Sequence, residues 1–127
     1  MSTKEERPIL LVEDDPLLRD ALRILLEEAG YLVRVAATAA ETLAAVAVET
    51  PALILLDLGL PDRSGLDVVR MLRARPGTRP TPIVALTGSV GPRDRQACLE
   101  AGCTSFLAKP VEPQYLLRRL PTLLQSG

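Results

Sequence analysis

The strongest constraint on the fold is a regular alternation of short apolar runs with segments of helical periodicity, repeated five times along the chain. The run 52–56 has no polar interruption before Asp57, which is typical of a central strand covered on both faces. Strands that alternate with helices predict a parallel sheet with helices on both faces. We therefore expect an α/β fold with a doubly wound, five-stranded parallel sheet in the order 2-1-3-4-5. The predicted strands are residues 9–12, 31–36, 52–56, 82–86 and 105–108.

Residues that start and stop helices mark the segments between these strands. Asp15 precedes Pro16, which suits the first turn of a helix, and we assign Asp15 mainly to capping that helix. Gly30 is expected to end it. Thr38 and Glu41 have the spacing of a capping box and open a second helix, to about residue 49. The remaining helices are predicted from about 66 to 73, from 92 to 102 and from about 113, with a kink or an end at Pro121.

Size and charge limit the classes of function. The 127 residues fit one domain, which we expect to span 1–127 with its core at about 8–124. A net charge of −1 gives no broad basic surface, so we expect no nucleic acid as a partner of this domain. The polar start of the chain does not resemble a signal peptide, and no apolar run approaches the ~18 residues of a membrane span. These observations predict a cytoplasmic protein without membrane insertion.

Missing and rare residue types exclude several kinds of chemistry. The chain contains no histidine, which excludes a Ser-His-Asp triad, a Cys-His pair, a histidine-ligated zinc ion and a phosphohistidine. The two cysteines, Cys98 and Cys103, do not make a disulfide framework, and we interpret them as small thiols. Any chemistry on phosphate must therefore use carboxylates, lysine, hydroxyls and backbone amides.

Polar residues stand at the ends of four of the predicted strands. Because the carboxyl ends of parallel strands meet at one edge of a sheet, ligand sites of doubly wound folds lie there. Taken singly, each residue also has a plain structural explanation, as a helix cap, a turn residue, a loop hydroxyl or a surface lysine. Their joint placement predicts one site. Its candidates are Glu13, Asp14 and Asp15 after the first strand, Asp57 after the third, Thr87 after the fourth and Lys109 after the fifth.

The chemistry of these side chains is mutually consistent. Carboxylates that crowd together repel one another, and a hard divalent cation such as Mg²⁺ relieves this repulsion. Lys109 can pair with Asp57 or with a phosphoryl oxygen, and Thr87 offers a hydroxyl to a second oxygen. A carboxylate can act as a nucleophile and form an aspartyl phosphate, while the rest of the site supplies position and charge neutralisation.

From about residue 8 to 124 the chain resembles the receiver domain of bacterial two-component response regulators. The resemblance rests on the stretches ILLVEDDP, LILLDLGLPDRSGLDV, PIVALTG and FLAKP and on their spacing. It implies a flavodoxin-like (βα)5 fold. It also implies a signalling protein that takes a phosphoryl group from a histidine kinase or a phosphotransfer protein and then acts on a downstream protein target. It does not imply an enzyme with turnover on outside substrates.

The resemblance also implies roles for the residues of the site. Asp57 matches the phosphoacceptor, and Lys109 matches the lysine that binds the phosphoryl group. Asp14 matches the direct Mg²⁺ ligand, and Glu13 matches a residue that acts on the metal mainly through water. Gly59 would lend its backbone carbonyl to the metal.

Three further positions match the switch of the family. Thr87 matches the hydroxyl that swings to the phosphoryl group, and Phe106 matches the aromatic residue whose rotamer follows it. Pro110 matches a proline that follows a cis peptide bond. The resemblance thus implies that phosphorylation changes the surface formed by the fourth helix, the fifth strand and the fifth helix, although Phe106 also has the simpler interpretation of a core ring.

The chain departs from the family pattern at a few positions. Gly59 and Ser89, two residues past Asp57 and Thr87, are small and leave water some access to a phosphoryl group. Thr104 and Ser105 stand where many DNA-binding regulators carry an acid for a symmetric dimer, which weakens the case for that dimer. The segment 111–113 is reminiscent of receivers attached to hybrid kinases. A single-domain regulator, a phosphorelay intermediate and part of a longer chain all remain open.

Three other readings compete. A pseudo-receiver, a binding module that is never phosphorylated, would have the same fold, but the complete set of site residues argues against it. A flavodoxin-like cofactor carrier would need a phosphate-binding loop after the first strand, where this chain has three acids. A hydrolase with a covalent aspartyl phosphate tends to have a second Asp two residues past the nucleophile, and that position is Gly59.

Overall fold

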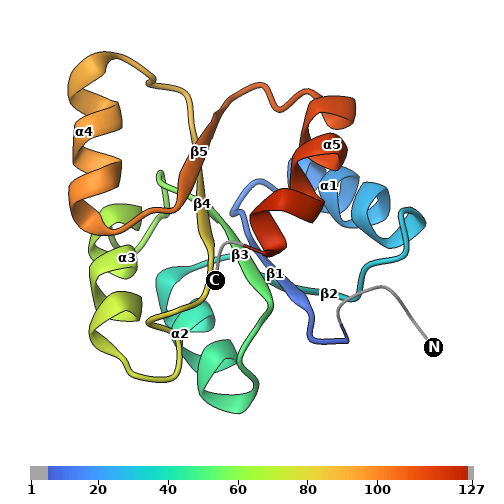
Figure 1. Ribbon diagram of the computed structural model, residues 1–127, viewed down its shortest axis with the longest axis horizontal. Coiled ribbons are helices and arrows are strands. Elements are labelled where there is room, and N and C mark those ends of the chain that lie inside the picture. The colour runs from blue at the N-terminus through green and yellow to red at the C-terminus, as the bar shows by residue number, and fades with distance from the viewer. Residues whose placement is uncertain (1–5, 126–127) are drawn as a thin grey trace.

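Five parallel strands form one sheet in the computed structural model, which describes residues 6–125 (Figure 1). The strand order is β2-β1-β3-β4-β5, which confirms the predicted fold class and order. The strands lie close to their predicted positions, except that β2 begins two residues late. Their bounds are β1 Ile9–Val12, β2 Val33–Ala36, β3 Leu53–Asp57, β4 Ile83–Thr87 and β5 Ser105–Ala108.

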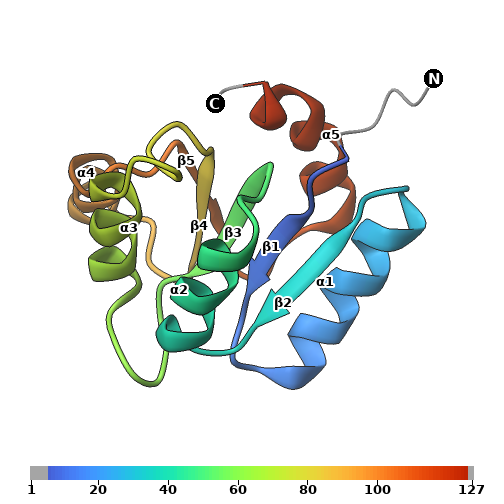
Figure 2. The ribbon, with the colours of Figure 1, turned by 90° about the horizontal axis from the view of Figure 1, so that it is seen from below.

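Five helices cover both faces of the sheet (Figure 2). Helices α1 and α5 lie on one face, and α2, α3 and α4 lie on the other. Each face has its own aliphatic core, because successive side chains of a strand point to opposite faces: Ile9 and Leu11 pack toward α1 and α5, and Leu10 and Val12 pack toward the other helices. The helices are α1 Pro16–Glu28, α2 Ala39–Val48, α3 Gly65–Ala74, α4 Pro92–Ala101 and α5 Pro113–Leu124.

Capping residues fix where α1 begins and ends. The Asp15 side chain accepts a hydrogen bond from Leu17 N–H at 3.0 Å, as its N-cap assignment predicts. Gly30 has φ 97°, a left-handed conformation that glycine adopts without strain, and it follows the last turn. Tyr31 N–H then donates back to Leu26 O at 3.1 Å, so Tyr31 belongs to this helix end rather than to β2 as predicted.

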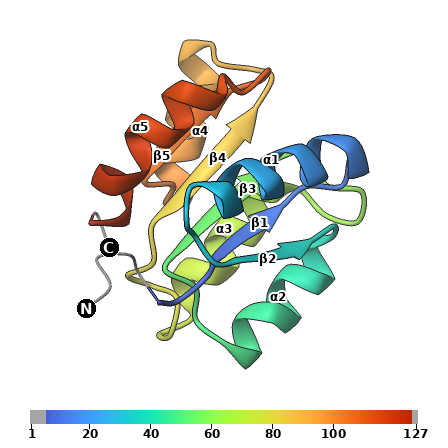
Figure 3. The same cartoon turned by 90° about the vertical axis from the view of Figure 1, so that its right-hand side faces the viewer.

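Helix α5 does not end at Pro121, so that part of the prediction is wrong. The helix extends to Leu124 with Pro121 inside it, and Figure 3 shows α5 on the same side of the sheet as α1. Proline removes one backbone hydrogen bond in a helix interior. Here the helix stays intact because Leu120 and Leu123, on either side of Pro121, are buried in the core that α5 shares with α1.

One arginine, Arg73, forms hydrogen bonds with both loops that lead into β4 and β5. Arg73 stands near the end of α3, and its half-buried guanidinium group meets neutral oxygen atoms only. Removal from water lowers the pKa of Arg73. Gly102 leaves the room that this side chain needs, because a Cβ atom there would lie 2.7 Å from Arg73 Cγ. The acceptors are Gly102 O at 2.8 Å, Thr78 O at 3.2 Å, Arg79 O at 2.8 Å, Thr81 O at 2.6 Å and Thr104 Oγ1 at 3.3 Å.

The two cysteines are both free and buried, as the interpretation of them as thiols requires. Burial raises the pKa of Cys103 to about 12, which keeps this side chain protonated at neutral pH. Among residues 6–125, no helix combines the length and the apolar character that a membrane span requires.

Candidate functional site

The strand register brings the predicted acidic residues together at the carboxyl edge of the sheet. Val12 of β1 pairs with Leu56 of β3, so the next residues along the two strands, Glu13 and Asp57, are neighbours. One carboxylate oxygen from each of Glu13, Asp14 and Asp57 lies within 4.8 Å of the others. Glu13 and Asp57 are only 1% and 5% exposed, whereas Asp14 faces solvent. The site is therefore a cluster of three carboxyl groups, two of them buried and one exposed.

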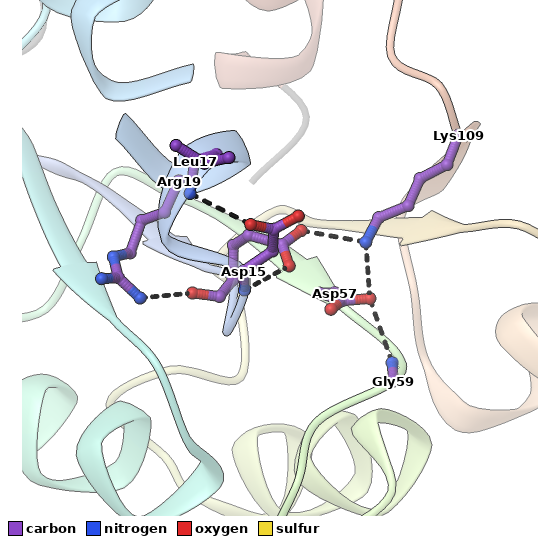
Figure 4. A network of polar contacts seen from close by, with 7 residues as sticks. Asp15, Leu17, Arg19, Asp57, Gly59 and Lys109 are labelled. Atoms are coloured by element: carbon purple, nitrogen blue, oxygen red, sulfur yellow. Dashed lines mark hydrogen bonds and ion pairs between the residues drawn. The ribbon is translucent and has the colours of Figure 1, made fainter. Parts of the chain in front are cut away.

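Lys109, directly after β5, contacts this carboxylate cluster. Its Nζ atom lies 2.9 Å from Glu13 Oε1 and 3.1 Å from Asp57 Oδ1. Figure 4 shows the lysine reaching from the β5 side toward Asp57. Lys109 N–H also donates to Thr87 O at 2.8 Å, which links the ends of β4 and β5. The predicted phosphate-binding lysine thus contacts both buried carboxylates.

Asp57 is held by the loop that follows it. Gly59 N–H donates to Asp57 Oδ1 at 3.0 Å, so the carboxylate has a fixed orientation at the end of β3. A Cβ atom at position 59 would lie 3.8 Å from the same oxygen, an ordinary contact distance. Glycine therefore leaves open the space beside the carboxylate that a larger side chain would partly cover.

The pKa values of the two buried carboxyl groups are shifted in opposite directions. Burial raises the pKa of Glu13 above its ordinary value, despite the opposing effect of Lys109. Burial also acts to raise the pKa of Asp57, but the Gly59 N–H and the Lys109 ammonium group outweigh it, and the pKa of Asp57 is lowered. Burial acts to lower the pKa of Lys109, whereas the two carboxylates raise it and prevail. At neutral pH Asp57 is thus an anion, as the predicted phosphoacceptor role requires.

The donor set fits a hard divalent cation. All three clustered residues offer oxygen, which is the donor that Mg²⁺ prefers, and one ammonium group does not balance three carboxyl groups. Glu13 Oε1 is buried and accepts no well-aligned hydrogen bond, although Lys109 Nζ is near it. A buried oxygen without a well-placed donor and an exposed carboxylate beside it are features that a cation would satisfy.

Asp15 stands apart from the cluster, as predicted. Its carboxylate caps α1, and its backbone N–H donates to Glu13 Oε2 at 3.1 Å. Arg19, which the sequence did not single out, donates from Nη1 to the Glu13 backbone carbonyl at 3.1 Å (Figure 4). The sequence signal that could have pointed to Arg19 is a positive charge near the start of a helix. The helix dipole disfavours such a charge unless nearby oxygen atoms compensate.

Asp62 is a second residue that the sequence missed. It lies in the loop between β3 and α3, and its carboxylate accepts from Ala39 N–H at 2.8 Å and from Ala40 N–H at 3.1 Å, at the start of α2. The hydrogen bond from Ala39 lowers the pKa of Asp62. This contact fixes the site loop to a neighbouring helix. A Pro-Asp pair in a turn-rich loop gave no sign of the distant acceptor role.

The three positions that match the switch of the family have defined surroundings. Thr87 is buried at the end of β4, and its hydroxyl donates to Ser89 O at 3.1 Å and accepts from Ser89 N–H at 3.0 Å. The hydroxyl therefore bonds its own loop. Phe106 is half-buried on β5, with the Arg95 guanidinium carbon 5.4 Å from its ring centroid. The Lys109–Pro110 peptide bond is cis.

Comparison with known families identifies this arrangement. A model of the response regulator receiver domain matches residues 9–121. The chain belongs to this family. The receiver domain is the module of two-component signalling systems that the sequence resemblance indicated, and the fold described above agrees with it.

Relatives of this receiver differ in length. An uncharacterised 14.6 kDa protein from the sodA1 3′ region of Leptolyngbya boryana is 39% identical over 118 residues, which cover 93% of this receiver and 90% of that protein. The DNA-binding response regulator MtrA of Mycolicibacterium smegmatis is 39% identical over 127 residues, which cover 100% of this receiver and 54% of MtrA. This receiver thus spans about half the length of several curated relatives.

A solved structure has the same architecture. The receiver domain of the sensor histidine kinase PA1611 from Pseudomonas aeruginosa PAO1, described with a magnesium ion coordinated in its active site cleft, superposes with a TM-score of 0.87. The two chains are 34% identical, and the match covers 96% of this receiver and 100% of that domain.

Proposed function

We propose that this receiver accepts a phosphoryl group on Asp57 from a histidine-phosphorylated partner, with Mg²⁺, and that the modification changes its α4–β5–α5 surface. The observation that carries the proposal is an ionised, buried Asp57 held between Gly59 N–H and the Lys109 ammonium group, beside two further carboxyl groups. The 127 residues contain no histidine, so the donor histidine would lie outside them, in a histidine kinase or a phosphotransfer protein.

The proposed reaction is a displacement at phosphorus. An Asp57 oxygen attacks the phosphorus atom of the phosphohistidine, an O–P bond forms, the N–P bond breaks, and the imidazole nitrogen keeps the electron pair. We assign the attack to Oδ2, because Oδ1 already accepts from Gly59 N–H and faces Lys109. Lys109 then stands where its ammonium group can neutralise a phosphoryl oxygen.

The acidic residues would hold the metal. Asp14 and Asp57 would bind Mg²⁺ directly, Gly59 through its carbonyl and Glu13 mainly through water. When bound, Mg²⁺ neutralises negative charge on the transferring phosphoryl group. The related PA1611 receiver, with magnesium in its cleft, supports this assignment.

The donor protein would dock beside the carboxylate cluster. Leu17 stands in the first turn of α1, directly beyond the Asp15 cap, and is 82% exposed. A large apolar side chain that is exposed next to a charged site is a suitable contact for a partner protein. We propose that the protein signals in the cytoplasm and does not turn over outside substrates. Its downstream target would be a protein, and this domain would not contact nucleic acid.

The switch would begin at Thr87. Its hydroxyl leaves Ser89 for a phosphoryl oxygen, which vacates space beside β4, and the Phe106 ring turns inward. This biases the surface of α4, β5 and α5 between two states.

The test is phosphorylation by a small donor. The protein is incubated with acetyl phosphate and Mg²⁺ and its intact mass is followed, with EDTA, Asp57→Asn and Asp62→Asn as parallel samples. We expect one phosphoryl adduct that needs Mg²⁺, is absent from Asp57→Asn and is retained by Asp62→Asn. Failure to label, under conditions that label a known receiver, would favour a pseudo-receiver that acts only as a protein-binding module.

A further inference from the structure

Arg95 of α4 is connected to both switch residues. Its guanidinium group lies over the Phe106 ring, with 5.4 Å from the guanidinium carbon to the ring centroid. Its Nε atom donates to Val90 O at 3.0 Å. Val90 directly follows Ser89, the residue that the Thr87 hydroxyl holds by two hydrogen bonds. Thr87 and Phe106 are thus joined through the loop and one arginine side chain.

Arg119 of α5 stands on the other side of the same strand. Its guanidinium group donates to Tyr115 OH at 2.7 Å and to Ser105 Oγ at 3.2 Å. Ser105 and Phe106 are consecutive residues of β5, the edge strand that α4 and α5 flank (Figure 1). The two arginines therefore border one surface from opposite sides of β5.

The surface between them combines positive charge with exposed apolar side chains. Leu99 of α4 is 55% exposed and Tyr115 of α5 is 43% exposed. Within residues 6–125, neither Arg95 nor Arg119 has a carboxylate in ion-pair contact. The surface can therefore accept carboxylates from outside.

The acidic residues of the two helices are engaged elsewhere. Asp94 accepts from Gly91 N–H, Glu100 accepts from Gln96, and Glu112 caps α5 by accepting from Tyr115 N–H. In a symmetric dimer through this face, the arginines would meet only carboxylates that already accept a hydrogen bond within their own chain. A foreign acidic segment suits the face better than a second copy does.

We propose that the α4–β5–α5 face binds an acidic segment of the downstream protein target through Arg95 and Arg119, and that the resting protein withholds Arg95 by holding it on Phe106 and Val90. This inference rests on the proposed function for its regulation. Movement of Thr87 to a phosphoryl group would release the Ser89–Val90 segment, and the inward turn of Phe106 would remove the ring. Both restraints on Arg95 end together, and its guanidinium group becomes free to pair with a carboxylate.

The partner chemistry is tested by selection from random peptides. A displayed library of random peptides is selected on the full chain with Mg²⁺ and beryllofluoride, which stands in for the phosphoryl group. We expect the selected peptides to be enriched in Asp and Glu with apolar residues between them. The best peptide is then titrated against Arg95→Gln, Arg119→Gln and, as a matched control, Arg34→Gln, an exposed arginine on β2 at the opposite edge of the sheet.

Each of the first two variants should bind the peptide roughly tenfold more weakly, equivalent to about 1.4 kcal/mol, while Arg34→Gln binds as the parent does. Peptides without acidic enrichment, or equal binding by all variants, would overturn the proposal. So would tighter binding of a single-stranded oligonucleotide through the same two arginines, since the face would then recognise phosphates.

The restraint on Arg95 is tested with Phe106→Leu. Without activation, this variant should bind the selected peptide nearly as well as activated parent protein, and the resting parent should bind it roughly tenfold more weakly. In NMR spectra, the Arg95 Nε–H signal of the parent should lose its ring-current shift on activation. Unchanged affinity in Phe106→Leu together with an unchanged Arg95 signal would contradict the restraint.

The two proposals fail separately. An Asp57 that cannot be phosphorylated would remove the proposed function, yet peptide binding to resting Phe106→Leu and its dependence on Arg95 and Arg119 would still be measurable. Normal phosphorylation without arginine-dependent peptide binding would remove only the inference about the target.

Discussion

The two ends of the same sheet each hold one half-buried cation, and the two cations are surrounded by different kinds of acceptor. At the amino end, Arg73 donates to five neutral oxygen atoms of the loops before β4 and β5. At the carboxyl end, Lys109 lies between the carboxylates of Glu13 and Asp57. A buried charge needs partners in either case. Neutral oxygen atoms give a fixed scaffold, whereas carboxylates also attract other cations, so a metal ion can bind beside the lysine.

The largest effect on stability should come from removing the cation at the amino end of the sheet. Arg73→Met leaves several buried oxygen atoms without donors, and we expect a loss of about 3 kcal/mol in the free energy of unfolding. Urea unfolding measures it, with the exposed Arg75→Met as the control. The fraction of folded protein that acetyl phosphate labels should not change. Equal stability of the two variants would show that Arg73 is not the scaffold we describe.

Mg²⁺ should act at the carboxyl end alone. A ligand that binds only the folded state stabilises it by about 1.4 kcal/mol at tenfold excess over its dissociation constant. We expect the melting temperature of the parent to rise with Mg²⁺ and that of Asp14→Asn to rise much less. Arg73→Met should keep the full response. An equal response of Asp14→Asn and the parent would place the metal elsewhere.

Neutralising Glu13 should stabilise the metal-free protein. Burial raises the pKa of this group, so its charge opposes folding once the pH is above the folded-state pKa. Glu13→Gln should therefore gain about 1 kcal/mol at neutral pH in EDTA, the size expected for one poorly satisfied buried oxygen. The gain should vanish at a pH below the ordinary pKa of glutamate, where the parent is protonated as well. A loss of stability at neutral pH would mean that the Lys109 contact outweighs burial.

The smallest effect should distinguish Asp62, a structural carboxylate, from the carboxylates of the proposed metal site at the same end of the sheet. The hydrogen bond from Ala39 lowers the pKa of Asp62, so its contribution to stability is present above the ordinary pKa of aspartate and is lost as the pH falls through the folded-state value. We expect Asp62→Asn to be slightly less stable than the parent at pH 7 and equal to it in strong acid. Thermal melts across this range measure the difference, and a constant difference at all pH values would contradict the capping role.

Local patterns predicted most of the fold and the acidic site. The uninterrupted run before Asp57 marked the central strand, and the Thr38 hydroxyl caps α2 by accepting from Glu41 N–H at 3.0 Å, as its spacing indicated. The convergence of Glu13 and Asp57 followed from the rule that parallel strands end at one edge.

Contacts between distant loops could not be predicted in this way. Asp62 bonds Ala39 across 23 positions, and Arg73 bonds Thr104 across 31, and neither pair has a periodic signal. The helix end predicted at Pro121 was wrong because the local cost of proline is visible in sequence, whereas the burial of Leu120 and Leu123 that offsets it depends on the packed neighbours.

Phe106 is the only phenylalanine of the 127 residues, and it stands half-buried at the centre of the proposed switch. Biosynthetic incorporation of fluorophenylalanine would therefore label this protein at a single position, with no background to assign. Two rotamers in slow exchange would appear as two peaks, and their areas would report the populations directly. The chain thus provides a built-in spectroscopic probe of its own signalling state.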